Sequence, residues 1–464
     1  MGQRNKEKRA AKKRRKQQRG PTPPRGGSPE RHGPHGPGCT CDDTDVFGGG
    51  FGGEAPWMSA PSADALVEVL LIAAQAQGDD DPGAAVSCSS ELSETIAPRH
   101  ERTLGTAASI ALSRVLGSLW QGGWMPADLW ELARRRTDAM ATSLLVDTIA
   151  ADTGRHAQAT VHDRWAEHVR WIDAAVWWNE GHPHLGQWAG HHGLDTEQAL
   201  HTTIMLLTQM MLLPKLPQIV PPPGTASNRS TASAAGVAPN ILARVRGLLA
   251  KAESTEFPDE AEALSAKAQE LMNRYAFERA LLDAENPEQQ TATSVRLWLD
   301  SPYVEAKSHL VSAIAEANRS KTVMYPKLGF IAVVGEAMDL EITELLTTSL
   351  LIQATRAMLA EGRHITGAGT SRTRSFRQSF LVSYATRIGE RLDEASSRAH
   401  DAAEDERLLP VLAARSRVVD ETFNEMFQHT VEKAISASNG AGWHAGRAAA
   451  DRADLSVERP EVNA

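Results

Sequence analysis

Half of the histidines gather in one stretch of the chain, and clustered imidazoles are common ligands of transition metals. Eight of the sixteen lie between His156 and His201. Of these, His156, His162 and His168 are six residues apart, a spacing that turns an α-helix by about 600° and scatters the side chains around it. Four more fall in a predicted glycine-containing loop: His182, His184, His191 and His192. Because no His-Glu-x-x-His motif is present, we interpret these as helix-surface and loop histidines and predict no metal and no cofactor.

A second group of zinc-type ligands lies near the N-terminus: His32, His35, Cys39 and Cys41. Their spacing is unlike that of a zinc finger and they are flanked by Gly and Pro, so we expect a tail without a folded metal site. The chain has three cysteines in all. That number excludes a disulfide scaffold and favours a reducing cytoplasm.

The most pronounced charge pattern is the basic N-terminal run. Between Arg4 and Arg19, ten Lys or Arg residues accompany one acid, whereas the rest of the chain has 39 basic and 57 acidic residues. Crowded cations bind phosphate groups, so this run is the first candidate for contact with nucleic acid or another polyanion. The candidate residues are Lys12, Lys13, Arg14, Arg15 and Lys16. The competing interpretation is a solubilising extension.

A second basic group lies on one predicted helix: Arg372, Arg374, Arg377, Arg387 and Arg391. On a helix Arg374 and Arg377 are neighbours, so both are candidates for phosphate contact. The alternative for this group is ordinary solvation and pairing with Glu390 and Glu394.

Tryptophans are also concentrated, with eight of the eleven between Trp120 and Trp188. Aromatic side chains can stack on bases, but here they follow helical spacing among Val, Ile and Ala, which favours core packing. Trp177 and Trp178 are adjacent and point to different sides, so we expect one of them to be exposed at an interface.

These groups are distributed over five predicted segments. We expect a disordered tail over 1–60, an all-helical bundle over 61–213, a Pro/Ser/Ala linker over 214–239, a helix hairpin over 240–284 and an α+β domain over 285–456. No run of about 18 apolar residues occurs, so we predict no membrane-spanning helix.

Local patterns predict the elements of the bundle. Pro126 suits the first turn of a helix that runs towards Ala151. Trp165, Val169, Ile172 and Val176 form a helical stripe in the stretch 156–180. Asp195 and Gln198 resemble a capping box before an apolar run. We expect four helices in all.

In the C-terminal half, alternation of Val295, Leu297 and Leu299 with polar or aromatic residues predicts a strand. Lys321–Tyr325 and Phe330–Val334 predict a β-hairpin. Helices are predicted at 303–318, 338–360, 375–404, 410–427 and 442–453. The fold class is therefore α+β and mostly α, with a small antiparallel sheet covered by long helices.

The predicted hairpin carries three motifs: Ile241-Leu-Ala-Arg-Val-Arg-Gly-Leu-Leu-Ala-Lys-Ala-Glu, Asp259-Glu-Ala-Glu-Ala and Ala266-Lys-Ala-Gln-Glu-Leu-Met-Asn-Arg-Tyr275. They resemble the domain of unknown function 2786 family. The sequence behind them is similar to its companion C-terminal domain, through the runs that begin at Glu344, Ser375 and Gly442. The layout is similar to an actinobacterial version. The resemblance implies an architecture without an established activity, so no catalytic residue is assigned.

Together these patterns predict a non-enzymatic cytoplasmic interaction protein that contacts nucleic acid or another polyanion through its basic tail. The alternative is a hydrolase, possibly metal-dependent, with its site between the β-hairpin and the helices that begin near 338 and 375. A third interpretation is a structural helical protein that binds a protein partner through its surplus tryptophans. We expect no membrane partner.

Overall fold

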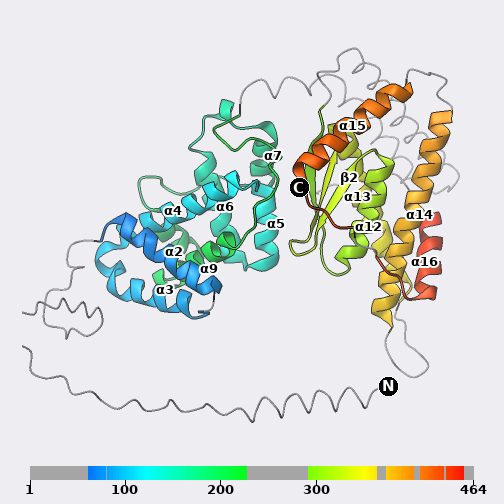
Figure 1. Ribbon diagram of the computed structural model, residues 1–464. Helices are drawn as coiled ribbons and strands as arrows, with labels where there is room; N and C mark the ends of the chain where they lie inside the picture. Colours follow the sequence, from blue (N-terminus) through cyan, green and yellow to red (C-terminus); the bar gives the residue numbers. More distant parts are fainter. Residues whose placement is uncertain are drawn as a thin grey trace, which may run out of the picture. The chain divides into compact units, whose positions relative to one another are not determined.

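The computed structural model describes residues 61–79, 81–226, 291–362, 372–401, 408–432 and 435–453, without the side chains of 396–401 and 408–412. The described residues all lie in one compact unit, Ser59–Ala464. They confirm a mostly α fold with one small antiparallel sheet (Figure 1). None of the helices in these ranges is long and apolar enough to cross a membrane. The basic tail, the Cys39 and Cys41 region and the helix hairpin lie outside the described residues.

The first described region is a helical bundle. Its elements are α2 (Ala63–Asp79), α3 (Ala84–Thr95), α4 (Ala97–Gln121), α5 (Pro126–Arg136), α6 (Ala139–Thr153), the 3-10 turn η2 (Gln158–Thr160), α7 (Asp163–Trp171), α8 (His184–His192) and α9 (Thr196–Met211). This region therefore has eight α-helices in its described part, and the expectation of four was wrong.

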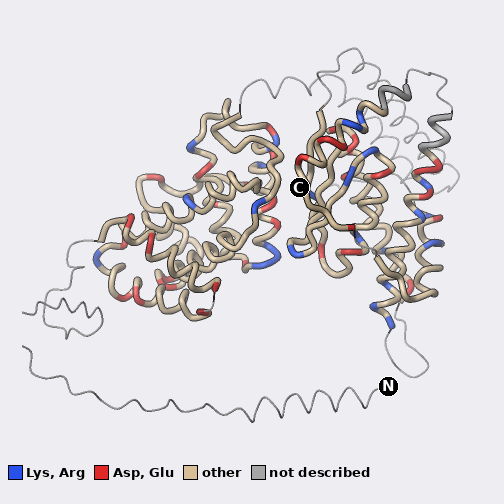
Figure 2. The backbone as a smooth tube through the Cα atoms, in the orientation of Figure 1, with Lys and Arg blue, Asp and Glu red and all other residues tan. Residues whose placement is uncertain are grey.

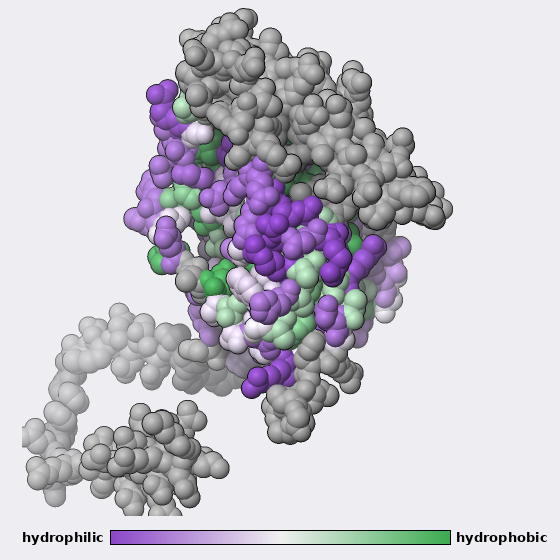
Figure 3. Space-filling view, turned by 90° about the vertical axis from the view of Figure 1, so that its right-hand side faces the viewer, coloured by the Kyte–Doolittle hydropathy of each residue, from purple (hydrophilic) through white to green (hydrophobic). Residues whose placement is uncertain are grey.

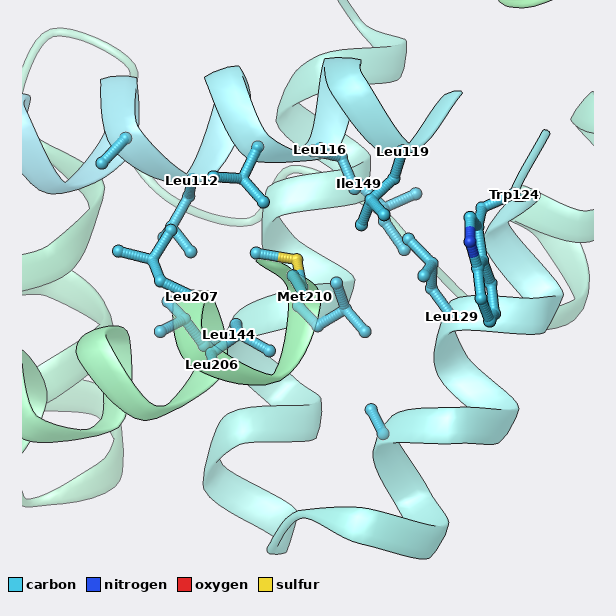
Figure 4. Close-up of a cluster of buried hydrophobic side chains, with 14 of the residues drawn as sticks. Leu112, Leu116, Leu119, Trp124, Leu129, Leu144, Ile149, Leu206, Leu207 and Met210 are labelled. Atoms are coloured by element: carbon cyan, nitrogen blue, oxygen red, sulfur yellow. The ribbon is translucent and has the colours of Figure 1, made fainter. Parts of the chain in front are cut away.

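Apolar residues at helical spacing build the bundle core. Helix α4 buries Leu112, Leu116 and Leu119, three or four positions apart, so they share one face. Figure 4 shows these side chains together with Leu144 and Ile149 of α6 and with leucines and a methionine of α9. Each fully buried leucine contributes about 1.5–3 kcal/mol relative to an exposed one, so this seam is a main source of stability.

The chain breaks twice where the sequence predicted continuous helix. Instead of one helix from Pro126 to Ala151, α5 ends before Thr137, which is extended (φ −123°, ψ 178°). Asp138 then caps α6 by accepting a hydrogen bond from the Ala141 N–H at 2.8 Å. An N-cap carboxylate satisfies an otherwise unpaired helix N–H, and this local gain outweighs the continuous apolar pattern.

The stripe from Trp165 is also interrupted. Helix α7 ends at Trp171, and Asp173 adopts the left-handed region at φ 54°. Trp165 and Ile172 are buried as predicted, whereas Val176 is exposed.

The predicted loop around His184 is instead helix α8, which ends at Gly193 with φ 67°. The next expectation is confirmed, because Asp195 and Gln198 form a complete capping box at the start of α9.

The C-terminal half follows the predicted order closely. Its strands are β1 (Thr293–Trp298), β2 (Lys321–Tyr325) and β3 (Phe330–Gly335), paired antiparallel in the order β1-β3-β2. Its helices are α12 (Val304–Ala317), α13 (Ala337–Ala360), α14 (Thr373–Asp401), α15 (Leu408–Met426) and α16 (Gly440–Asp451). The predicted β-hairpin and the five helices are confirmed.

Strand β3 is buried along its whole length because both faces of the sheet are covered. Ile331 and Val333 pack with residues of α12 and α13. The alternate residues Phe330, Ala332 and Val334 belong to the hydrophobic cluster that contains the bundle core and Phe427. Because alternate side chains of a strand point to opposite faces, β3 contributes to a different hydrophobic cluster on each side of the sheet.

Helices α14 and α16 approach each other through glycine. A Cβ atom at Gly442 would overlap the carbonyl oxygen of Phe376, and one at Gly446 would overlap that of Phe380. Only glycine, which has no Cβ atom, lets the backbone of α16 approach the backbone of α14 this closely. The Gly-x-x-x-Gly spacing therefore fixes the distance between the two helices.

Candidate functional site

The centre of the candidate site is a buried carboxylate in the bundle. Asp147 lies on α6, and 8% of its side chain is exposed. The Trp177 indole N–H donates to both carboxylate oxygens at 3.0 and 3.1 Å, and His184 Nε2 lies 2.7 Å from one of them. With the proton on Nε2, the imidazole keeps a lone pair on Nδ1 that can accept a proton or a hydrogen bond.

A cavity of about 380 Å³ opens beside this pair. Helix α4 and the C-terminal part of α6 form its walls, and the segment from Trp178 to His184 forms its third side. The Asp147 carboxylate therefore fixes this segment against α6 through His184 and Trp177. Cavities of roughly 300–1,000 Å³ are the usual size for small-molecule sites, so this one is large enough for a ligand.

Two arginines line the cavity from different elements. Arg102 on α4 donates from Nη2 to the Gly181 carbonyl at 2.9 Å, and Arg155, just after α6, donates from Nη1 to Ser113 Oγ at 2.9 Å. Both acceptors are neutral groups of the cavity lining. No ion pair joins either arginine to a carboxylate in the described part of the chain.

A second polar contact joins α6 to α8. Ser143 Oγ lies 3.0 Å from His192 Nε2, and the Trp188 indole N–H donates to the same oxygen at 3.3 Å. Burial lowers the pKa of His192, and the neighbouring His191 lowers it further. Neutral His192 can accept a hydrogen bond from the Ser143 hydroxyl, so this contact ties the two helices together at ordinary pH.

The histidines of 156–201 are thus spread over several elements. His162 caps α7, His168 lies within α7, and the four predicted loop histidines lie in α8 or just before it. Within the described ranges, no group of three or more His, Cys, Asp or Glu side chains is arranged to hold a metal ion.

A further cluster of charges is buried between the bundle and the sheet. Arg296 of β1 and Asp128 of α5 form an ion pair at 2.5 Å, with 4% and 5% of their side chains exposed. The Trp298 indole N–H donates to the other Asp128 oxygen at 3.0 Å. Arg296 also donates to the Pro217 carbonyl at 2.7 Å. These contacts join three segments that are far apart in the sequence.

Helix α7 adds two basic groups to this cluster. Arg164 donates to the Ser294 carbonyl at 2.7 Å. Burial lowers the pKa of His168 to about 4, and although Asp128 opposes the shift, the nearby Arg164 and Arg296 guanidiniums favour the neutral ring. His168 is therefore neutral at physiological pH, and its shielded Nδ1 has no hydrogen-bond partner. None of these groups lines the cavity, and their role is to hold the bundle on the sheet.

Sequence reasoning missed the Asp128–Arg296 pair. Its two residues are separated by 168 positions, so no local pattern links them. The available signal was Arg296 itself, a charge between Val295 and Leu297 in the predicted strand. Such a charge requires a partner when its side chain is buried.

The predicted basic group on α14 divides into two parts. Arg372 and Arg374 are exposed at its start, and Arg377 is partly buried with an Nε atom that lacks a hydrogen-bond partner. None of the three has an ion pair with a carboxylate among the described residues. Figure 2 shows basic residues at the beginning of α14 and mixed charges farther along it.

The later arginines of α14 are used within the fold. Arg387 pairs with Glu390 at 2.9 Å, Glu394 at 3.4 Å and Asp451 at 2.5 Å. Arg391 donates instead to the carbonyls of Ala450 and Ala453 at the end of α16. The predicted pairing with Glu390 and Glu394 therefore holds for Arg387 and not for Arg374 or Arg377.

The region predicted for the alternative hydrolase contains a smaller polar contact. His309 of α12 lies 3.3 Å from Thr386 Oγ1 of α14, and burial lowers the pKa of this histidine. This contact joins two packed helices and does not by itself support a hydrolase site.

The tryptophans serve both packing and hydrogen bonding. Trp120, Trp124, Trp165 and Trp188 are buried, which agrees with the expected core packing. Trp171 and Trp177 are more than one third exposed, and Trp177 is the more exposed member of the adjacent pair.

Comparison with known proteins gives one match. No curated protein and no solved structure is significantly similar to the chain. Residues 240–279 match the sequence model of the family described as "Protein of unknown function (DUF2786)". This segment coincides with the motifs from Ile241 to Tyr275. The chain therefore contains a DUF2786 segment at these residues.

Proposed function

We propose that this is a non-enzymatic interaction protein that contacts nucleic acid or another polyanion. The observation that supports the folded part of this proposal is the contrast along α14. Arg387 is bound to carboxylates, whereas Arg372, Arg374 and Arg377 have no ion pair among the described residues. Guanidinium groups that the fold leaves unpaired are the ones available to phosphate.

The basic tail supplies the larger part of the attraction. Its residues Lys12, Lys13, Arg14, Arg15 and Lys16 are consecutive, and the rest of the chain carries an excess of acids. At physiological salt a charge is screened beyond about 8 Å. The acidic body therefore weakens the attraction only where the polyanion comes close to it.

The surface around α14 and α16 suits a polar partner. Figure 3 shows the right-hand side of Figure 1, where α14 and α16 lie, and hydrophilic residues gather in the middle of its described part. Polar and positively charged surfaces are typical of nucleic-acid interfaces, whereas a helical protein partner favours a contiguous apolar patch.

The test compares charge variants of the full chain at one ionic strength. The tail variant replaces Lys12, Lys13, Arg14, Arg15 and Lys16 by Gln, and the helix variant replaces Arg372, Arg374 and Arg377 by Gln. A control replaces three other exposed arginines, Arg114, Arg170 and Arg417, by Gln. It changes the net charge by the same amount as the helix variant. Binding to a fluorescent single-stranded RNA and to a DNA duplex is measured by anisotropy.

We expect the tail variant to lose at least about tenfold in affinity and the helix variant several-fold, with the control within about twofold of the natural chain. Equal losses for the helix variant and the control would show that net charge alone acts and that α14 makes no contact. Absence of binding by the natural chain would refute the proposal.

A further inference from the structure

The cavity beside Asp147 and His184 plays no part in the proposed contact with a polyanion. It lies in the bundle, on residues of α4 and α6, and none of the candidate arginines of α14 lines it. A ligand in this cavity would therefore be bound independently of the proposed polyanion contact.

The two arginines of the cavity are positioned without being neutralised. A guanidinium has five N–H donors, and within the described part of the chain one hydrogen bond holds each side chain: Arg102 donates to the Gly181 carbonyl and Arg155 to Ser113 Oγ. These neutral acceptors reduce the conformational freedom of the side chains but leave their charges available. Arg102 and Ser113, which anchors Arg155, lie about 16 Å apart along α4, so the two guanidiniums suit different parts of one anionic ligand.

The acids of the cavity do not cancel these charges. Asp147 is the buried one, and both of its oxygens already accept hydrogen bonds from Trp177 and His184. Glu180 also lines the cavity, but it is exposed to solvent and forms no ion pair with Arg102 or Arg155.

The hydroxyl groups of the lining indicate what the rest of the ligand carries. Thr106, Ser109 and Thr148 donate their own protons to carbonyls one turn earlier in their helices, so they face a ligand as acceptors. Ser113 accepts from Arg155 and keeps its proton free to donate. A phosphate beside Ser113 and Arg155, joined to a part with O–H groups, satisfies both kinds of partner.

We propose that this cavity binds a small phosphate monoester of a hydroxylated compound, with Arg155 and Ser113 holding the phosphate and Arg102 contacting the hydroxylated part. A volume of about 380 Å³ exceeds the roughly 30 Å³ occupied by a water molecule by an order of magnitude, so it accepts the organic part as well as the phosphate. His184 also lines the cavity, and Asp147 positions its ring.

Ribose 5-phosphate is the probe, and inorganic phosphate and succinate are the comparisons. Binding to the full chain is measured by isothermal titration calorimetry at constant ionic strength. The variants are Arg102→Gln and Arg155→Gln, and the matched control is Arg114→Gln, on the same helix α4 but outside the cavity and paired with Glu68. Circular dichroism verifies that each variant is folded.

We expect ribose 5-phosphate to bind more tightly than inorganic phosphate, and each cavity variant to weaken it at least about tenfold while the control stays within about twofold. Thr106→Phe provides a test that keeps both arginines. Thr106 is exposed and lines the cavity, so the protein should tolerate a phenylalanine ring at this position. The ring should fill part of the cavity and weaken the binding of ribose 5-phosphate.

Three results would overturn the inference. They are no binding of ribose 5-phosphate up to about 10 mM, equal binding of succinate, and equal weakening by Arg114→Gln and the cavity variants. The tail variant separates this inference from the proposed function, because it must retain ribose 5-phosphate binding even though it loses RNA.

Discussion

Removal of the Asp128 carboxylate should destabilise the protein severely. In the Asp128→Ala variant the Arg296 guanidinium, with only 4% of its side chain exposed, loses its counter-charge. The Trp298 indole N–H loses its acceptor at the same time. Breaking a buried ion pair from one side costs about 3–5 kcal/mol, and an unsatisfied buried N–H costs about 1–3 kcal/mol. We expect a total near 4–5 kcal/mol, because the two losses share one site and are not additive.

The free energy of unfolding is measured by urea titration, followed by circular dichroism and tryptophan fluorescence. The informative partner is the double variant Asp128→Leu with Arg296→Met. Replacement of a buried ion pair by apolar residues of similar size is often neutral or stabilising, so the double variant should recover most of the loss. The control is Arg114→Ala, which breaks the exposed pair with Glu68 and should cost less than about 1 kcal/mol.

The reasoning would be refuted in either of two ways. Asp128→Ala could cost no more than Arg114→Ala, which would mean that water reaches the pair. Alternatively, Asp128→Leu with Arg296→Met could be at least as unstable as Asp128→Ala, which would mean that the unpaired guanidinium is not the source of the loss.

Three further predictions concern stability. The pKa of His168 is lowered to about 4 in the folded protein, so as the pH falls the unfolded chain takes up a proton first. The free energy of unfolding should therefore be highest above about pH 6.5 and fall by up to about 3 kcal/mol towards pH 4. Urea titrations over this pH range should show a smaller fall for His168→Gln. Gly446→Ala should cost about 1–3 kcal/mol in thermal melts, because overlap with the Phe380 carbonyl outweighs the gain of about 1 kcal/mol in helix propensity; an unchanged melting temperature would contradict the close approach. Asp195→Ala should cost about 0.5–2 kcal/mol by loss of the capping box, and Gln198→Ala added to it should cost little more, as a double-mutant cycle would show.

Elements with complete local signals were predictable from the sequence. The strand Phe330–Gly335 and its partner Lys321–Tyr325 are separated by Pro326 and Gly329, and Gly329 adopts φ 91° in the turn. The capping box at Asp195 is equally local. In each case the residues that determine the structure lie within a few positions of one another, so tertiary contacts did not override them.

Two boundaries were missed, one where local signals compete and one where a distant contact decides. The break between α5 and α6 depends on the Asp138 cap, which competes with an apolar pattern that continues across it. Helix α8 is short and is positioned by the contact of its first residue, His184, with Asp147, 37 positions away. For α8 the available signal was Gly193, since a glycine after an apolar run often ends a helix.

The candidate site shows the same limit. Arg102 and Arg155 carry no motif, and each is ordinary as a residue on a helical surface. They belong to one cavity lining because α4 packs on α6, which buries Leu112 and Leu144 in one core. A cavity of this kind is a property of the packed helices and has no counterpart in local spacing.

The measurement that tests the proposed function most directly is the salt dependence of RNA binding by the natural chain and by the variant with Lys12, Lys13, Arg14, Arg15 and Lys16 replaced by Gln. Each phosphate contact adds about 0.7–0.9 to the slope of log affinity against log salt concentration. Five contacts through the tail predict a slope that is smaller by up to about 3.5–4.5 in the variant. Equal slopes for the two proteins would contradict a role for the tail in polyanion binding.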